Sequence, residues 1–188
     1  MRRVIFSAVA ALAVQSGTAA QPSPSNSIFG MEAGKPVPYP FCEGYSSKVV
    51  CQRIAGSKDQ PWQEVFINFP SDQVPEIMSS IVMSVKTDGG VVVGYNFETL
   101  GIRSQDRDIA ILSEKFGKPT SVSYSDMTTL SGGQFQAALA RWEFDDLHIT
   151  LNSMGYGTRA GRVEIYTTEG MRLKRERDAA DDSKRVPL

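Results

Sequence analysis

Three apolar residues near the middle of the chain recur at helical spacing: Ile109, Leu112 and Phe116. Their separations of i, i+3 and i+7 place them on one stripe of a helix. Ser104 is a preferred type of N-cap residue, and Asp106 and Asp108 suit the positive end of a helix. Gly117-Lys118-Pro119 ends the segment, because glycine adopts the left-handed conformation at a helix end and proline cannot continue the helix. The pattern therefore predicts a helix over residues 104–116 with one apolar face.

Alternation of apolar and polar residues predicts β-strands in most other segments. The predicted strands cover residues 64–69, 81–86, 91–97, 121–125, 140–144, 147–152 and 162–167, with 28–31 as a short edge strand. Strands and helix together predict an α+β fold, in which an antiparallel sheet of hairpins carries one principal helix (104–116) on one face. Five aromatic residues are expected to pack between the helix and the sheet: Tyr95, Phe97, Tyr124, Trp142 and Phe144.

The turn between strands 81–86 and 91–97 follows from the apolar pattern. A three-residue loop, Thr87-Asp88-Gly89, pairs Val85 with Val91 and joins the apolar residues of both strands on one face. Gly89 supplies the left-handed residue that such a loop needs at its last position. We therefore predict a bulged three-residue turn, which also pairs Met83 with Val93.

Asp145-Asp146 is expected to form the two-residue turn of a second hairpin. Four cross-strand pairs follow from this register: Phe144 with Leu147 and Trp142 with Ile149 on the buried side, and Glu143 with His148 and Arg141 with Thr150 on the other.

Residues 1–20 have the three parts of a secretory signal peptide. Arg2-Arg3 forms the positive start, Val4 to Val14 an apolar run, and Thr18-Ala19-Ala20 offers small residues at the cleavage site. The apolar run is too short to span a bilayer. No lipid anchor is expected, because the first cysteine, Cys42, lies far from the cleavage site. These features predict export by the general secretory route, to the periplasm or the medium.

Composition divides the chain into four segments: a signal peptide (1–20), a flexible Pro/Ser-rich leader (21–27), a single domain (28–168) and a charged C-terminal helix or tail (169–188). Loss of Arg2 and Arg3 with the signal lowers Lys plus Arg from 20 to 18 against 21 acidic residues, and the formal net charge changes from −1 to −3. This charge argues against nucleic acid as a partner, and no later segment has the roughly 18 apolar residues of a membrane span. We expect a soluble domain that binds another envelope protein. The sequence indicates no particular oligomeric state.

Cys42 and Cys51 are the two cysteines of the chain. In an oxidising compartment a disulfide between them is expected, and so short a loop contributes about 2–3 kcal/mol in the chain-entropy model. The alternative is a redox pair. It is disfavoured because the spacing differs from the C-x-x-C motif that lowers a thiol pKa at a helix start.

His148 is the one histidine of the chain, and its expected neighbour Glu143 makes a candidate acid–base pair. No activated nucleophile stands beside it in the sequence, because Ser153 lacks a nucleophile elbow and Ser131 lies on a glycine turn. A polar cross-strand pair on a wet sheet face is the simpler interpretation. With one imidazole and both thiols expected in a disulfide, the sequence predicts no metal site and no cofactor.

Five residues are expected to share the sheet face opposite the helix: Arg141, Glu143, His148, Glu164 and Tyr166. Tyrosine and arginine are enriched among residues that dominate the binding energy of protein interfaces. This face is therefore the candidate binding surface.

The helix, the stop at Gly117-Lys118-Pro119 and the strands that follow resemble a type of small exported bacterial module over Ser104 to Thr168. That type includes the outer-membrane assembly lipoproteins of the SmpA/OmlA type and the β-lactamase-inhibitor proteins. The resemblance implies a helix packed on an antiparallel sheet and a function in protein binding rather than catalysis. The chain departs from the type in lacking a lipid-attachment cysteine and a second helix beside the first, and in its disulfide-bearing N-terminal half. No binding residue is carried over, and a separate exported family is the alternative.

The sequence therefore predicts a periplasmic, non-enzymatic protein-binding or envelope-assembly module. Two alternatives stay open. One is a small hydrolase centred on His148 and Glu143. The other is a carrier of a small ligand, which requires a cavity between the helix and the sheet.

Overall fold

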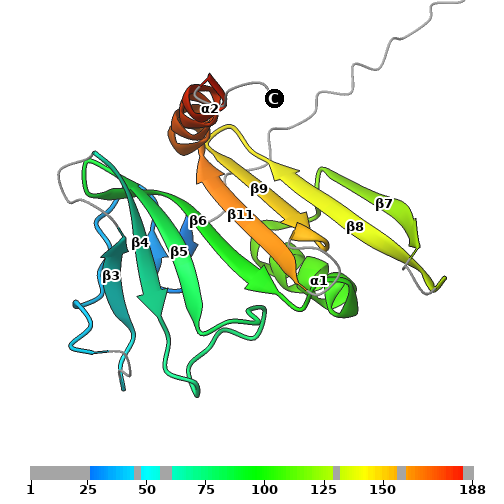
Figure 1. The fold of residues 1–188 in the computed structure, drawn as a ribbon, viewed down its shortest axis with the longest axis horizontal. Helices are drawn as coiled ribbons and strands as arrows, with labels where there is room; N and C mark the ends of the chain where they lie inside the picture. Colours follow the sequence, from blue (N-terminus) through cyan, green and yellow to red (C-terminus); the bar gives the residue numbers. More distant parts are fainter. Residues whose placement is uncertain (1–25, 45–47, 56–60, 129–131, 156–159, 184–188) are drawn as a thin grey trace, which may run out of the picture.

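The computed structural model describes residues 26–44, 48–55, 61–128, 132–155 and 160–183. Eight strands form one antiparallel sheet in the spatial order β3-β4-β5-β6-β11-β9-β8-β7 (Figure 1). The strands are β3 Cys51–Ala55, β4 Trp62–Asn68, β5 Val82–Asp88, β6 Val91–Thr99, β7 Ser121–Thr128, β8 Gln134–Glu143, β9 Leu147–Asn152 and β11 Gly161–Thr167.

Three further features accompany the large sheet: a two-stranded pair, β1 (Ser27–Ile28) with β2 (Met31–Glu32), a short 3-10 turn (η1, Gly101–Arg103), and two helices, α1 (Gln105–Phe116) and α2 (Thr168–Ser183). The α+β class is confirmed. The architecture differs from the predicted single helix on hairpins, because the sheet dominates the fold and the charged C-terminal segment forms a second helix.

One face of the sheet, called the inner face below, holds the hydrophobic core. Successive cross-strand partners line it with apolar side chains: Ile54, Val65, Val85, Tyr95, Ile165, Ile149 and Trp142. α1 covers this face through Leu112 and Phe116, which are 4% and 2% exposed. The β1–β2 hairpin covers it through Ile28 and Met31, both buried in the same cluster. The predicted apolar stripe of 104–116 is thus the core-facing side of α1.

The β1–β2 hairpin replaces the predicted single strand over 28–31. Phe29 and Gly30 have φ angles of 47° and 79°. Two consecutive residues with positive φ form the two-residue turn typical of hairpins, and the chain reverses between Ile28 and Met31. The Tyr95 hydroxyl donates to the Met31 carbonyl at 3.2 Å, which ties the hairpin to β6.

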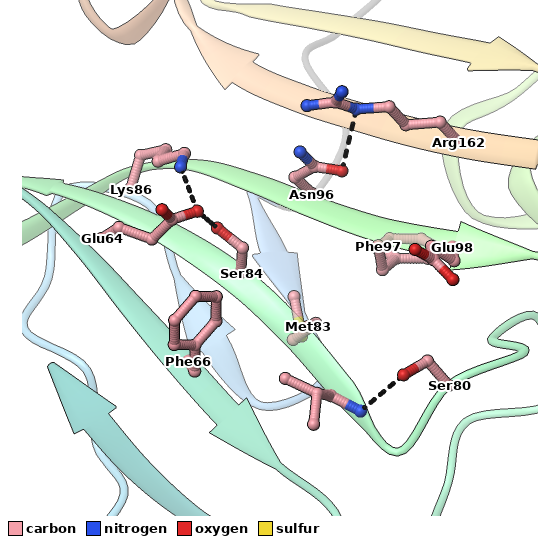
Figure 2. A pocket seen from close by; sticks show the side chains of 11 residues that line it. Glu64, Phe66, Ser80, Met83, Ser84, Lys86, Asn96, Phe97, Glu98 and Arg162 are labelled. Atoms are coloured by element: carbon pink, nitrogen blue, oxygen red, sulfur yellow. Dashed lines mark hydrogen bonds and ion pairs between the residues drawn. The ribbon is translucent and has the colours of Figure 1, made fainter. Parts of the chain in front are cut away.

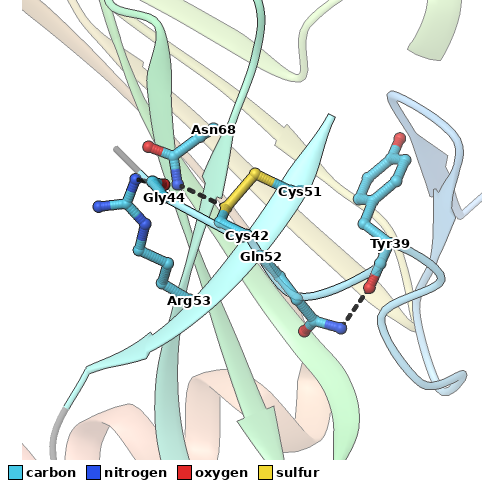
Figure 3. The surroundings of a disulfide bond; sticks show 7 residues. All are labelled: Tyr39, Cys42, Gly44, Cys51, Gln52, Arg53 and Asn68. Carbon is cyan, nitrogen blue, oxygen red and sulfur yellow. Dashed lines mark hydrogen bonds between the residues drawn. A yellow bond between two sulfur atoms is a disulfide. The ribbon is translucent and has the colours of Figure 1, made fainter. Parts of the chain in front are cut away.

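Residues 40–42 run along the outer edge of β3 and close it. The Gln52 amide donates to the Pro40 carbonyl at 2.8 Å, and the Cys42 amide donates to the Gln52 carbonyl at 3.1 Å. The predicted disulfide between Cys42 and Cys51 is confirmed and holds the same segment (Figure 3). The first edge of the sheet is therefore already paired.

The predicted turn between β5 and β6 is wrong. Gly89 and Gly90 form a two-residue turn with φ angles of 54° and 85°, and Asp88 pairs with Val91. The register then shifts between Lys86 and Thr87, so that Val85 lies opposite Tyr95. Val92 exchanges backbone hydrogen bonds of 2.8 and 2.9 Å with residues 34 and 35. This bulge returns the apolar residues of both strands to the inner face. The three-residue loop was predicted for the same reason.

The β8–β9 hairpin has the predicted register. Trp142 pairs with Ile149, Glu143 with His148, and Arg141 with Thr150. Of the five aromatic residues expected in the core, Tyr124 is the exception, with 51% of its surface exposed. It lies on β7, the last strand of the sheet, beyond the part of the inner face that α1 covers.

The ends of α1 lie close to their predicted positions, but their chemistry differs. The Ser104 hydroxyl does not cap a backbone amide; it donates to Oδ2 of Asp108 at 2.7 Å. Asp108 is completely buried, although the sequence predicted only that its charge suits the positive end of the helix. Gly117 has the predicted positive φ (79°) with an extended ψ of −174°, and its carbonyl accepts a 2.8 Å hydrogen bond from Nε1 of Trp142.

Several predictions fall outside the described residues: the signal peptide, most of the leader over 21–27, Ser131 of the glycine turn and the end of the C-terminal tail. Within the described ranges, no helix is both long enough and apolar enough to cross a membrane.

Candidate functional site

The outer face of the sheet, opposite α1, carries mostly polar side chains. The pairing registers place one residue from each strand in a continuous row: Arg53, Phe66, Ser84, Asn96, Glu164, Thr150, Arg141 and Ser121. The neighbouring row contains Glu64, Lys86, Gly94, Tyr166, His148 and Glu143. The five residues of the predicted binding surface therefore share this face, in two adjacent rows.

Tyr166 is not available for binding, because α2 covers one end of the outer face. This helix packs on β6, β9 and β11 (Figure 1). Tyr166 is 2% exposed, and its ring lies over Gly94, where an added Cβ would come within 2.3 Å of it. Burial, with the charge of Glu164, raises the pKa of the Tyr166 hydroxyl. Tyr166 thus belongs to a second packed layer beneath α2, while Arg141 and Glu143 stay exposed.

His148 and Glu143 form the predicted pair, with 2.5 Å between Nδ1 of His148 and Oε2 of Glu143. Sequence reasoning missed a third member, Thr168, whose Oγ1 lies 3.4 Å from Nε2 of His148. A hydroxyl, an imidazole and a carboxylate in this order resemble a catalytic triad. However, the Thr168 hydroxyl donates to the Asp145 carbonyl at 2.8 Å. In this arrangement the three side chains link the β8–β9 turn to the start of α2.

A hollow of about 320 Å³ opens on the outer face between β4, β5, β6 and β11 (Figure 2). It lies where β5 and β6 separate. Their pairing ends at Ser84 and Asn96, although β5 begins at Val82 and β6 continues to Thr99. The loop before β5 borders the hollow through Ser80, and the Ser79 amide donates to the Glu98 carbonyl at 2.9 Å.

The two cations that line the hollow are engaged by neighbouring side chains. Lys86 contacts the Glu64 carboxylate, which also accepts a 2.5 Å hydrogen bond from Ser84. Burial alone would raise the pKa of Glu64, but the hydrogen bonds from Lys86 and Ser84 lower it below its ordinary value. Arg162 donates to Asn96 at 3.1 Å and pairs with Glu164 at 3.0 Å.

Glu98 differs from these lining residues. In the part of the chain that the structure describes, no ion pair reaches its carboxylate, which is half-buried on the rim. Phe66 lies across the hollow from it and is 36% exposed (Figure 2). The hollow therefore combines an available carboxylate with an exposed aromatic ring, a combination that suits a cation.

The residues of the hollow were absent from the sequence-based candidates, although one signal was present. Glu64, Ser84, Lys86 and Asn96 are the polar alternates of strands that the sequence identifies, so their place on the outer face could have been predicted. The separation of β5 from β6 could not, because it depends on the path of the chain before β5.

The cavity expected of a small-ligand carrier, between α1 and the sheet, coincides with tightly packed core residues such as Leu112, Phe116 and Trp142. Across the described ranges, no group of three or more His, Cys, Asp or Glu side chains is arranged to hold a metal ion. Comparisons with protein-family models, with curated proteins and with solved structures gave no match.

Proposed function

We propose that this protein is an exported, non-enzymatic binding module that engages another envelope protein through the outer face of its sheet. The observation that carries the proposal is the hollow between β5 and β6, with Glu98 and Phe66 on its walls. A partner residue with a cationic side chain satisfies both groups. Exposed Arg141 and half-buried Thr150 extend the same polar face beyond the hollow.

Energetic considerations support a protein partner for this surface. Interfaces derive most of their affinity from a few central residues that fill pockets, surrounded by a polar rim. Glu64 and Lys86 hold each other in position before a partner arrives, as do Asn96 and Arg162. Such pre-organisation lowers the entropy that binding costs. An arginine or lysine of the partner would then place its charge between Glu98 and the Phe66 ring.

A crosslinking pull-down of the tagged mature protein from its own envelope fraction tests the proposal. Glu98→Lys and Arg141→Glu each reverse a charge on the outer face. Glu114→Lys reverses a charge on exposed α1 and is the matched control. We expect one stoichiometric partner that is retained by Glu114→Lys and lost or at least tenfold depleted with Glu98→Lys. Equal recovery with all variants would contradict the proposed surface.

A hydrolase is the second candidate, favoured by the triad-like arrangement of Glu143, His148 and Thr168. Thr168→Ala removes the hydroxyl, and His148→Ala removes the base. If the three act in catalysis, each substitution abolishes turnover of an ester or amide panel by the pure protein. We instead expect no turnover by the unmodified protein and an effect of both substitutions on thermal stability alone.

A further inference from the structure

The two edge strands of the large sheet, β3 and β7, differ in whether further backbone pairs with them. Residues 40–42 pair along β3 and the disulfide holds them there. At the other edge lies β7, which pairs with β8 through eight consecutive partners, from Ser121 with Arg141 to Thr128 with Gln134. Among the residues that the structure describes, β8 is the one strand beside β7.

Most of the devices that block edge strands are missing from β7 itself. Edges are usually protected by lysine or other charged side chains, proline, a bulge or very short length. β7 spans eight residues, has an unshifted register, and contains neither lysine nor proline (SVSYSDMT). Its one charged residue, Asp126, accepts a 2.9 Å hydrogen bond from Gln136. The backbone N–H and C=O groups of β7 that point away from β8 are thus available for pairing with a further strand.

Two apolar side chains of β7 lie exposed on its inner side. Val122 and Tyr124 are 40% and 51% exposed, and they belong to the face that holds the core, since they pair with Ala140 and Ala138. They stand two residues apart on one face. An antiparallel strand added to this edge would continue the inner face and cover both.

We propose that a second copy of this chain fills the edge, with β7 paired to β7 across a two-fold axis at Ser123. This register places Val122 of each copy opposite Tyr124 of the other, an aromatic–β-branched pair of the kind that stabilises sheets. It places Ser121 opposite Ser125 and Asp126 opposite Thr120, so that no carboxylate faces another.

The self-complementary pattern favours a second copy over an unrelated peptide. A two-fold interface uses the same patch on both subunits, and the short sequence from Thr120 to Asp126 satisfies that condition about its own centre. The resulting sheet would run continuously through both subunits. The outer faces, with their hollows, stay free, so this inference is independent of the proposed function.

Oligomeric state and site-specific crosslinking test the inference on the full mature chain. Sedimentation equilibrium should show a concentration-dependent dimer. Tyr124→Lys should raise the dimer dissociation constant at least tenfold, whereas Ile81→Lys, at a side chain that is 52% exposed elsewhere, should leave it unchanged. Near-ultraviolet circular dichroism verifies that both variants are folded.

Cysteine crosslinking checks the register independently of those variants. Directly opposite residues of antiparallel strands have Cα atoms about 4.5–5.5 Å apart, within the range of a disulfide. Ser123→Cys should therefore form an oxidised dimer. Thr128→Cys should not, because the two copies of that residue would lie roughly 34 Å apart. A monomer at every concentration, a dimer insensitive to Tyr124→Lys, or a monomer that captures only a foreign peptide would each overturn the inference.

Discussion

Gly170 of α2 lies so close to the backbone of Val93 in β6 that an added Cβ would come within 2.1 Å of the Val93 carbonyl oxygen. The Thr167 hydroxyl reinforces this contact, because it lies 3.3 Å from the same oxygen and accepts a 2.9 Å hydrogen bond from the Gly170 amide. The contact fixes where α2 begins on the outer face. It therefore fixes how much of that face stays uncovered.

Gly170→Ala is predicted to detach the start of α2 from the sheet. A methyl group cannot fit against a backbone carbonyl at that distance, so the helix must shift or release, and Tyr166 gains exposure. We expect faster amide hydrogen exchange in β6 and β11 and a lower midpoint of thermal unfolding. Ala179→Ser, at an exposed position of the same helix, serves as the control. Unchanged exchange in Gly170→Ala would show that α2 does not depend on this contact.

Reduction of the disulfide is predicted to destabilise the folded protein by about 2–3 kcal/mol, the value for a short closed loop in the chain-entropy model. The backbone pairing of Gln52 with residues 40 and 42 remains possible after reduction. This edge of the sheet should therefore become less stable without unfolding as a separate unit. Denaturant titration of the oxidised and reduced protein measures the difference. The double variant Cys42→Ala/Cys51→Ala should match the reduced protein; equal midpoints in both redox states would contradict the expectation.

Asp108 is predicted to make stability fall as pH rises. Burial raises the pKa of its carboxyl above the ordinary value, although the hydrogen bond from Ser104 opposes part of the shift. The folded protein therefore keeps a proton at Asp108 over a pH range in which the unfolded chain has released it. Its contribution to stability is fully present below the unfolded pKa and is lost as pH rises through the raised folded pKa.

Asp108→Asn isolates this contribution, because a neutral amide replaces the carboxyl without changing its shape. The free energy of unfolding of the variant, relative to that of the unmodified protein, should be larger at neutral pH than at about pH 4, where an ordinary aspartate titrates. Asp106→Asn, in the same turn but exposed, provides the comparison. A free-energy difference that stays constant with pH would rule out titration of Asp108 in this range.

Local patterns in the sequence were sufficient for much of the inner face. The stripe of Leu112 and Phe116 and the alternation around Trp142 and Ile149 both follow from burial on one side of a regular element, and the structure confirms them. The register of the β8–β9 hairpin also follows locally, because one short turn sets it.

Features that depend on distant segments were not predictable in this way. The bulge at Val93 lies beside Val92, whose backbone hydrogen bonds go to residues 34 and 35. Tyr124 is exposed because α1 does not extend over β7, and Tyr166 is buried because α2 folds back over the outer face. The hollow beside Glu98 arises where β5 and β6 separate, which no periodicity within either strand reveals.

Site-specific photocrosslinking in the native envelope tests the central proposal most directly. A photoreactive residue at Ser84, Thr150 or Arg141 reports on the outer face, and one at Glu114 or Lys115 reports on α1. We expect one crosslinked product of constant mass from the outer-face positions, lost when Glu98→Lys is added, and none from α1. Equal crosslinking from both faces, or a product that survives Glu98→Lys, would contradict the proposal.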